Sequence, residues 1–360
     1  MPEPSSIVSA IPATTPFVGP ETLEREMRKH FELRLGANES LFGASPLAIE
    51  AMQRQAAIGH FYGDPEGFEL RSEIAARHDC AIQNVVLGSG IDELLMLFCR
   101  AYLPVGDSAL TTFGSYPTFE YAVQSVGGKL LYDIYSDAGT IDLESMAHFA
   151  LVDAPQVLYL ANPDNPSGTW HGPDAIAEFR SQLHRDILFL LDEAYSDFAP
   201  EVAPFDPSDT GLVRLRTFSK GHGMAGIRIG FALCHAEHVS ALNKIRMHFG
   251  VSSVAQAGAL ASLRDEDHLA RVVSETIRVR DWLAKEMLAL GFPSLPSQTN
   301  FLTIQIGSKE RAEDVLLGLR KQSVFIRKPM KALDDHIRVS IGPQSVMEEF
   351  LERFRKVCPF

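Results

Sequence analysis

One glycine-rich segment brings two cations and two hydroxyls close together in the chain, RTFSKGHGMAGIRIG at residues 216–230. Lys220 comes directly after Ser219 and close to Thr217, and Arg228 follows further along. Hydroxyls and an arginine can bind an anion, and a lysine amine can form a covalent bond to an aldehyde. An ordinary solvated turn can have the same composition. The segment alone therefore leaves two interpretations open, a solvated turn or a close-fitting anion site.

A second candidate is the carboxylate that ends the apolar run DILFLLDEAYSDF, residues 186–198. Asp192 and Glu193 follow five apolar residues, and Tyr195 comes shortly after them. A carboxylate at the end of a buried strand is costly unless cations, hydrogen-bond donors or solvent satisfy it. The run therefore indicates either a solvated strand end or an Asp192 that pairs with something positive.

Three further polar positions follow apolar runs. In VVLGSGIDELL, residues 85–95, a glycine turn with Ser89 and Gly90 opens a helix, and the amides of such a helix start bind phosphate well. A plain turn explains this piece equally well, and without a GxGxxG pattern or a P-loop lysine nucleotide binding is unsupported. Asn165 lies in a rigid Pro-Ser-Gly turn, and Tyr116 can stack on a planar ligand or fill core.

The elements that must position these residues form an alternating pattern between about residues 85 and 235. Short runs that are hydrophobic on both faces alternate with helical segments, which predicts an open, mainly parallel α/β sheet of seven strands with helices on both faces. Ligands of such sheets bind at the carboxyl ends of the strands. The predicted strands are 84–89, 108–113, 129–134, 156–162, 186–193, 212–218 and 228–234.

The pattern changes after about residue 240. A long helix is predicted at 274–291, followed by strands at 300–306, 323–328 and 336–341 and a last helix from about Ser345. We expect three parts: an arm at residues 1–35 whose charged stretch 21–35 is helical and packs with the small domain, a large α/β domain at 36–245, and a smaller α+β domain at 246–360.

Composition excludes several classes of protein. The formal net charge is −13 over 360 residues, which argues against nucleic acid or an anionic membrane surface as a partner. The four cysteines are far apart and indicate free thiols in a reducing compartment, with no metal site. The N-terminal stretch has neither the positive nor the continuous apolar region of a signal peptide. We expect a cytoplasmic protein.

Together, the polar groups at the predicted strand ends describe one ligand. They offer a phosphate-binding set, a lone carboxylate, a flat aromatic ring, an amide, a phenol and a nucleophilic lysine. A ligand that matches has a phosphate, a planar ring with a basic nitrogen, a ring oxygen and an aldehyde, and this ligand is pyridoxal 5'-phosphate.

The chain resembles the fold-type I pyridoxal-phosphate aminotransferases of class I/II, and within them the histidinol-phosphate aminotransferase branch. The resemblance rests on the order and spacing of seven motifs: LGANESLFGASP (35–46), YGDPEGFELR (62–71), GSGIDEL (88–94), NPDNPSG (162–168), DEAYSDF (192–198), TFSKGHGMAGIRIGF (217–231) and IRVSIG (337–342). It implies a cytoplasmic homodimer that transfers an amino group from an amine with an anionic end, histidinol phosphate being favoured, to a 2-oxo acid such as 2-oxoglutarate, in amino-acid and specifically histidine biosynthesis.

The resemblance also implies roles for single residues. Lys220 would form the covalent aldimine with the cofactor, and Asp192 would pair with the protonated pyridine nitrogen. Tyr195 and Asn165 would contact the ring oxygen and Tyr116 would stack on the ring. The phosphate would be held by Ser89, Gly90, Ile91, Asp92, Thr217, Ser219 and Arg228, with Tyr62 contributed by the neighbouring subunit.

The implied substrate residues are less specific. Arg327 and Arg338 would bind the acidic group of the substrate, with Asn38 and Asn165 beside it. An arginine pair suits phosphate and carboxylate about equally well. We interpret Lys328 and Lys331 as part of a solvated face.

Three departures from the family pattern leave room for other substrates. The chain has Ser40 and Leu41 where the family has Asn-Pro, Phe17 where a phosphate-contacting tyrosine is frequent, and an unusual GHGM after Lys220. The alternatives are an aminotransferase for aromatic or other amino acids, a lyase resembling threonine-phosphate decarboxylase, a non-catalytic cofactor-binding or regulatory protein, and a sheet protein without cofactor.

Overall fold

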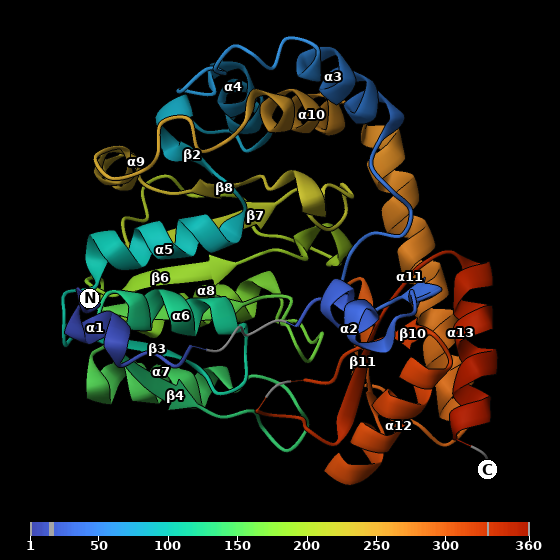
Figure 1. The fold of residues 1–360 in the computed structure, drawn as a ribbon. Helices are drawn as coiled ribbons and strands as arrows, with labels where there is room; N and C mark the ends of the chain where they lie inside the picture. Colours follow the sequence, from blue (N-terminus) through green and yellow to red (C-terminus); the bar gives the residue numbers. More distant parts are fainter. Residues whose placement is uncertain (1, 14–17, 330, 359–360) are drawn as a thin grey trace.

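The computed structural model describes residues 2–13, 18–329 and 331–358 (Figure 1). Its centre is a seven-stranded sheet with the strand order β2-β8-β7-β6-β5-β3-β4. The strands are β2 (Val85–Gly88), β3 (Ser108–Thr112), β4 (Lys129–Asp133), β5 (Val157–Ala161), β6 (Leu188–Asp192), β7 (Leu212–Thr217) and β8 (Gly230–Leu233).

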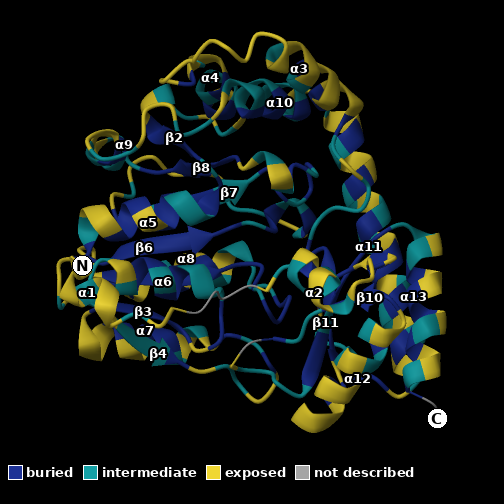
Figure 2. Cartoon of the chain, in the orientation of Figure 1, coloured by how far each residue is buried: buried dark blue, intermediate teal, exposed yellow. Residues whose placement is uncertain are grey.

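The sheet is mainly parallel, as the sequence predicts. Strands β4, β3, β5, β6 and β7 run parallel to one another, whereas β8 is antiparallel to both β7 and β2. Both faces of β5 are buried because successive side chains point to opposite faces: Val157 and Tyr159 join one hydrophobic cluster, and Leu158 and Leu160 join another. The neighbouring strand β6 is buried along its whole length, as its dark blue colour in Figure 2 shows.

Helices cover both faces of the sheet. The first cluster contains apolar residues of α5 (Ile91–Tyr102), α6 (Pro117–Ser125) and α9 (Ala236–Asn243). The opposite face packs against α7 (Leu143–Asp153) and α8 (Pro173–Gln182). A third cluster joins β2 and β8 to α3 (Pro46–Ala56), α4 (Phe68–Arg77) and α10 (Ser253–Arg264). This three-layer arrangement leaves the carboxyl ends of the parallel strands free to carry a site.

A further hydrophobic cluster lies beyond the sheet. It is formed by α11 (Glu266–Ala289), α12 (Lys309–Lys321), α13 (Gln344–Val357) and the strands β9 (Phe301–Gln305), β10 (Val324–Phe325) and β11 (His336–Ser340). Strands β9 and β11 pair antiparallel. Helix α11 links the two regions, since its ends contact α10 and α13 (Figure 1).

The arm has two separate contacts. Helix α2 (Pro20–Met27) leads to β1 (Leu33–Arg34), which pairs in parallel with β10. Near the N-terminus, α1 (Ser6–Ser9) contacts α6 at the sheet. The division into an arm and two domains, with boundaries near residues 35 and 245, stays a prediction.

Most of the predicted strands are present with ends shifted by a few residues. Two predicted elements were wrong in extent. The charged stretch 21–35 is not helical throughout, because Leu33 and Leu35 are buried in the cluster formed by α11, α12 and α13, and Leu33 pairs with Val324. The long helix begins at Glu266 rather than at residue 274. Asp265 caps its first turn by accepting a hydrogen bond from the His268 amide.

Candidate active site

A cavity of about 290 Å³ lies at the carboxyl ends of β5, β6 and β7. Residues from the sheet region and from the region of α11, α12 and α13 line it, so that side chains far apart in the sequence meet there. The lining residues are Ala37, Asn38, Glu39, Ile91, Asp92, Tyr116, Tyr159, Ala161, Asn165, Asp192, Ala194, Tyr195, Thr217, Ser219, Lys220, Ala225, Arg228, Arg327 and Arg338.

Lys220 stands in the loop that follows β7, with its amine inside the cavity. Nζ donates a hydrogen bond of 3.1 Å to the Asn38 carbonyl and lies 5.4 Å from the centroid of the Tyr195 ring. Burial, and then the charge of Arg338, lower the pKa of Lys220 from 10.5 to about 8. A substantial fraction of the amine is therefore neutral near physiological pH, as a nucleophile or a proton acceptor must be.

Asp192 is the last residue of β6 and is buried. Its Oδ2 accepts a 2.8 Å hydrogen bond from the Tyr159 hydroxyl and its Oδ1 accepts one of 2.9 Å from the Ala194 amide. Burial raises the pKa of Asp192 to about 6, against these hydrogen bonds, so it carries a negative charge at neutral pH. It is a fixed carboxylate at the floor of the cavity.

The neighbouring carboxylate has a different environment. Glu193 is buried between Arg214 and Arg216, with N–O distances of 2.7 and 3.0 Å. Burial opposes its ionisation, but the two guanidinium groups outweigh this effect and hold the pKa of Glu193 below its ordinary value. Successive residues of a strand face opposite sides, so only Asp192 reaches the cavity.

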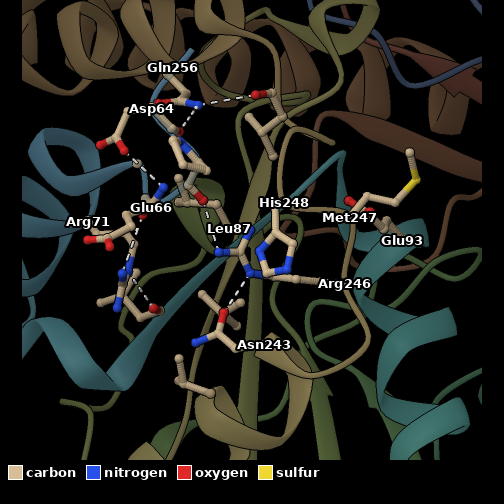
Figure 3. A pocket seen from close by; sticks show the side chains of 16 residues that line it. Asp64, Glu66, Arg71, Leu87, Glu93, Asn243, Arg246, Met247, His248 and Gln256 are labelled. Atoms are coloured by element: carbon tan, nitrogen blue, oxygen red, sulfur yellow. Dashed lines mark hydrogen bonds between the residues drawn. The ribbon is translucent and has the colours of Figure 1, made fainter. Parts of the chain in front are cut away.

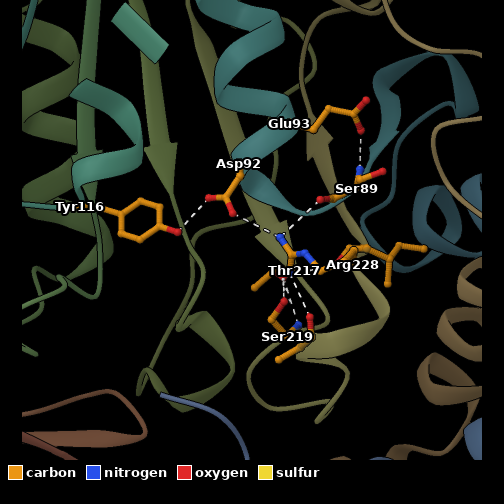
Figure 4. Close-up of polar contacts among 9 residues, drawn as sticks. Ser89, Asp92, Glu93, Tyr116, Thr217, Ser219 and Arg228 are labelled. Carbon is orange, nitrogen blue, oxygen red and sulfur yellow. Dashed lines mark hydrogen bonds and ion pairs between the residues drawn. The ribbon is translucent and has the colours of Figure 1, made fainter. Parts of the chain in front are cut away.

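One end of the cavity gathers hydrogen-bond donors for an anion (Figure 4). Thr217 Oγ1 lies 2.9 Å from Ser219 Oγ, and Arg228 Nη2 lies 3.2 Å from Asp92 Oδ2. Asp92 also accepts a 2.8 Å hydrogen bond from the Tyr116 hydroxyl. Helix α5 begins at Ile91 beside this group, so its first amides and the positive end of its dipole add to the site.

Two arginines also line the cavity. The Arg338 guanidinium donates a hydrogen bond to Asn165 Oδ1. In the same cavity, the Asn38 side-chain amide donates a hydrogen bond of 2.9 Å to the Tyr195 hydroxyl. Arg338 Nε is buried and has no hydrogen-bond partner among the described residues. Burial lowers the pKa of Arg338 to about 10, which still leaves it charged at neutral pH. Arg327 lines the same cavity.

Some predicted site residues lie outside the cavity lining. Ser89 Oγ donates a hydrogen bond of 2.7 Å to the Gly250 carbonyl. Gly90 packs against Arg228, since a Cβ added to Gly90 would lie 2.5 Å from Arg228 Nη2. Tyr62 is 84% exposed and touches the ring of Phe249 at a centroid distance of 4.7 Å. Phe17 lies outside the described residues.

Besides four alanines, the sequence analysis missed two lining residues with polar side chains, Tyr159 and Glu39. Tyr159 lies in the middle of β5, in an apolar run that is typical of core, and only its hydrogen bond to Asp192 sets it apart. Glu39 was treated only as part of a motif, and its charge acts on both Lys220 and Arg327. A carboxylate directly after Asn38 was the available signal for Glu39; no signal pointed to Tyr159.

A second, much smaller cavity of about 20 Å³ lies away from these residues, among Asp64, Arg71, Arg246 and His248 (Figure 3). Arg246 is already engaged there by Asn243 and the Pro65 carbonyl. Within the described ranges, no set of three or more His, Cys, Asp and Glu side chains could hold a metal ion. Among the same residues no helix is long and apolar enough to cross a membrane.

The cavity at the strand ends has groups that fit pyridoxal 5'-phosphate. Hydroxyls, an arginine and a helix start lie together, and a buried carboxylate and a lysine amine line the same cavity. The carboxylate matches a protonated ring nitrogen and the amine matches an aldehyde. The residues present therefore fit this group.

Comparisons with known proteins agree with this geometry. The family model for aminotransferase class I and II matches residues 32–354. Histidinol-phosphate aminotransferase 2 of Carboxydothermus hydrogenoformans is 32% identical to this chain, and the matched region covers 94% of each chain. The protein of the same name from Pseudomonas aeruginosa is 35% identical, and the match covers 90% of this chain and 89% of that one. The crystal structure of histidinol-phosphate aminotransferase from Sinorhizobium meliloti in complex with pyridoxal-5'-phosphate matches with a TM-score of 0.93 at 34% identity, covering 98% of both chains.

Proposed function

The chain belongs to the class I and II aminotransferase family, and on that premise we propose that it moves an amino group from histidinol phosphate to a 2-oxo acid such as 2-oxoglutarate. The enzyme is a pyridoxal-phosphate-dependent transaminase. The observation that carries an anionic donor is the pair Arg327 and Arg338 in the lining of the cavity.

The cofactor's phosphate would be held by Thr217, Ser219 and Arg228 together with the start of α5, and its ring would lie against Tyr116 with Asp192 at the ring nitrogen. Asn165 and Tyr195 would bind the ring oxygen. When bound, the cofactor supplies an electron-accepting ring that stabilises negative charge at the substrate Cα.

The protein groups perform the remaining tasks. Asp192 is negatively charged at neutral pH and favours a protonated ring nitrogen. The Lys220 amine, with its pKa near 8, can accept a proton from the substrate Cα and return it to a neighbouring carbon. The Asn38 carbonyl accepts a hydrogen bond from the free Lys220 amine and its side chain donates one to the Tyr195 hydroxyl, so Asn38 can orient the amine whenever it is free of the cofactor.

The substrate's anionic end would bind at the two arginines. Their guanidinium groups can donate bidentate hydrogen bonds to phosphate or carboxylate. The Nε of Arg338 is buried and has no hydrogen-bond partner among the described residues. A phosphate offers more acceptor oxygens than a carboxylate, and the named relatives act on a phosphorylated donor. Both facts support histidinol phosphate and a role in histidine biosynthesis.

The test is an absorbance titration of the cofactor-loaded enzyme with histidinol phosphate, and then with single amino acids, in the absence of any 2-oxo acid. Conversion of the bound cofactor to its amine form by histidinol phosphate supports the proposal. Conversion only by an aromatic or other amino acid would replace the donor and keep the reaction. Release of carbon dioxide from a phosphorylated amino acid would identify a lyase instead.

The second part of the proposal is a homodimer in which Tyr62 reaches the phosphate of the partner's cofactor. Tyr62 and Phe249 are exposed and in ring contact, and Phe61 and Met247 beside them in the chain are also exposed. An exposed apolar patch of this kind is typical of an interface. We also propose a cytoplasmic location, supported by four free cysteines, since reduced thiols persist there.

A further inference from the structure

The two arginines of the cavity are the base of one hairpin loop. The Arg338 amide donates to the Arg327 carbonyl at 2.6 Å, and the Arg327 amide donates to the Arg338 carbonyl at 3.3 Å. The loop between them joins β10 to β11. Whatever holds the tip of this loop therefore affects where both guanidinium groups lie.

The tip is held by residues of the seven-stranded sheet region. The Lys331 ammonium forms an ion pair with Glu120 and lies 5.5 Å from the centroid of Phe113 and 5.8 Å from that of Tyr132. The two rings meet edge to face at 5.4 Å and 89°. These three side chains form a three-sided cage for a cation, which we call the Lys331 cage.

The cage differs from an ordinary exposed ion pair. Exposed pairs contribute little because water screens them and long side chains lose freedom. The Glu120 side chain is only 9% exposed, whereas that of Lys331 is 39% exposed, so the carboxylate is shielded from water while the ammonium stays partly solvated. Burial, and then Glu120, raise the pKa of Tyr132 to about 12, so this phenol stays neutral beside the carboxylate.

The backbone of the tip is also specialised. Lys331 and Leu333 have φ values of 67° and 55°, in the left-handed region that residues with a side chain rarely adopt. Such conformations persist only where surrounding contacts hold them. Leu333 packs near Gly139, whose added Cβ would lie 3.5 Å from Leu333 Cδ2. Two contacts with the sheet region therefore fix the tip.

Helix α6 connects the cage to the cavity. Tyr116 caps this helix and lines the cavity, and Glu120 follows one turn later. The cage thus ties the arginine hairpin to the same helix that places Tyr116 over the cofactor site.

We propose that Lys331 is a positioning residue for substrate binding, whose contact with the cage fixes the hairpin so that Arg327 and Arg338 face the anionic end of the substrate. This inference rests on the proposed function, because it takes the two arginines as the substrate's anion site. Lys331 is itself exposed, as the interpretation of a solvated face predicts, and the proposal adds a role for its contact with the cage.

The chain offers a matched control. Lys328 lies in the same loop and forms an ion pair of 2.7 Å with Glu313 on α12. This helix packs with α11 and α13 and not on the seven-stranded sheet. Lys328→Met removes the same charge from the same loop without touching the cage.

The kinetic test uses the cofactor-loaded enzyme carrying Lys331→Met, Glu120→Gln, both changes, or Lys328→Met. Losing a partly buried, charge-assisted contact should raise KM for the anionic donor, and the inhibition constant of inorganic phosphate, by about tenfold. We expect kcat to stay within about twofold and the cofactor spectrum to stay unchanged. The double variant should be no worse than either single one, since both remove the same contact. Lys331→Arg should retain most of the affinity and Lys328→Met all of it.

The structural test needs no substrate and separates this inference from the proposed function. In the cofactor-loaded enzyme, amide hydrogen exchange of residues 331–338 should become faster in Lys331→Met and Glu120→Gln but not in Lys328→Met. If no phosphorylated donor is found, inorganic phosphate still reports the anion site. Unchanged exchange, or faster exchange with unchanged KM and phosphate inhibition, would show that Lys331 does not position the arginines.

Discussion

At the scale of single residues, Lys220 combines two properties that the reaction requires. Its amine lies inside the cavity, and its pKa of about 8 leaves it partly neutral. A positioned acid–base group contributes about 10²–10⁴ in rate, and in the proposed function Lys220 is also the covalent anchor of the cofactor. We therefore expect Lys220→Ala to lose at least about 10⁴-fold in turnover. Steady-state assays against Lys285→Ala, an exposed lysine on α11, would check this, and near-normal turnover of Lys220→Ala would overturn the assignment.

The lowered pKa of Lys220 has a direct consequence for cofactor uptake. Only the neutral amine attacks an aldehyde, and a pKa lowered from 10.5 to about 8 makes the neutral form available at lower pH. The rate at which cofactor-free enzyme binds pyridoxal phosphate covalently should therefore rise with pH and level off above about 8. Stopped-flow absorbance at a series of pH values measures this. Because the Arg338 charge helps to lower the pKa of Lys220, Arg338→Gln should move the midpoint upward. A wild-type midpoint near 10.5 would contradict the geometry.

At the scale of elements, the loop after Lys220 depends on one glycine. Gly223 has a φ of 68°, and an added Cβ would lie 2.3 Å from the Gly43 carbonyl oxygen. Gly223→Ala should therefore lower the free energy of unfolding by about 2 kcal/mol or more and weaken cofactor binding through displacement of Lys220. Gly226→Ala is the matched control, because an added Cβ there meets no atom within 4 Å. Urea denaturation and cofactor titration of both variants test the prediction, and equal stability of the two would refute it.

The sheet was predictable because its strands are buried on both faces, so that each one appears as an uninterrupted apolar run. The polar residues that end these runs indicated the cavity, because the carboxyl ends of parallel strands lie at the same edge of the sheet. Leu33–Arg34 was missed as a strand because its pairing with Val324 and Phe325 joins distant segments. The Lys331 cage was missed because its members become neighbours only when the hairpin reaches the sheet region. Residues in one run can be predicted from local pattern, whereas contacts between remote loops depend on the packing of the whole chain.

At the scale of the whole molecule, the exposed aromatic patch around Tyr62 has two proposed roles. It would form the dimer interface, and its Tyr62 hydroxyl would contact the partner's cofactor. The two roles can be tested separately. Tyr62 is 84% exposed and lies outside the lining of its own chain's cavity. If the partner's phosphate is its target, Tyr62→Phe should leave the dimer intact, because the ring contact with Phe249 remains, while the loss of one charge-assisted hydrogen bond weakens cofactor binding by about tenfold.

Phe249→Glu tests the other role. It places a charge in the patch, and burying that charge in an interface is costly, so this variant should sediment as a monomer and hold the cofactor more weakly than Tyr62→Phe does. Analytical ultracentrifugation and cofactor titration of the two variants, with Val105→Glu as a control at an exposed apolar residue elsewhere, distinguish the effects. A dimeric Phe249→Glu would place the interface elsewhere. A Tyr62→Phe variant with unchanged cofactor affinity would show that the hydroxyl does not reach the phosphate, and the anion site would then be complete within one chain, from Thr217, Ser219, Arg228 and the start of α5.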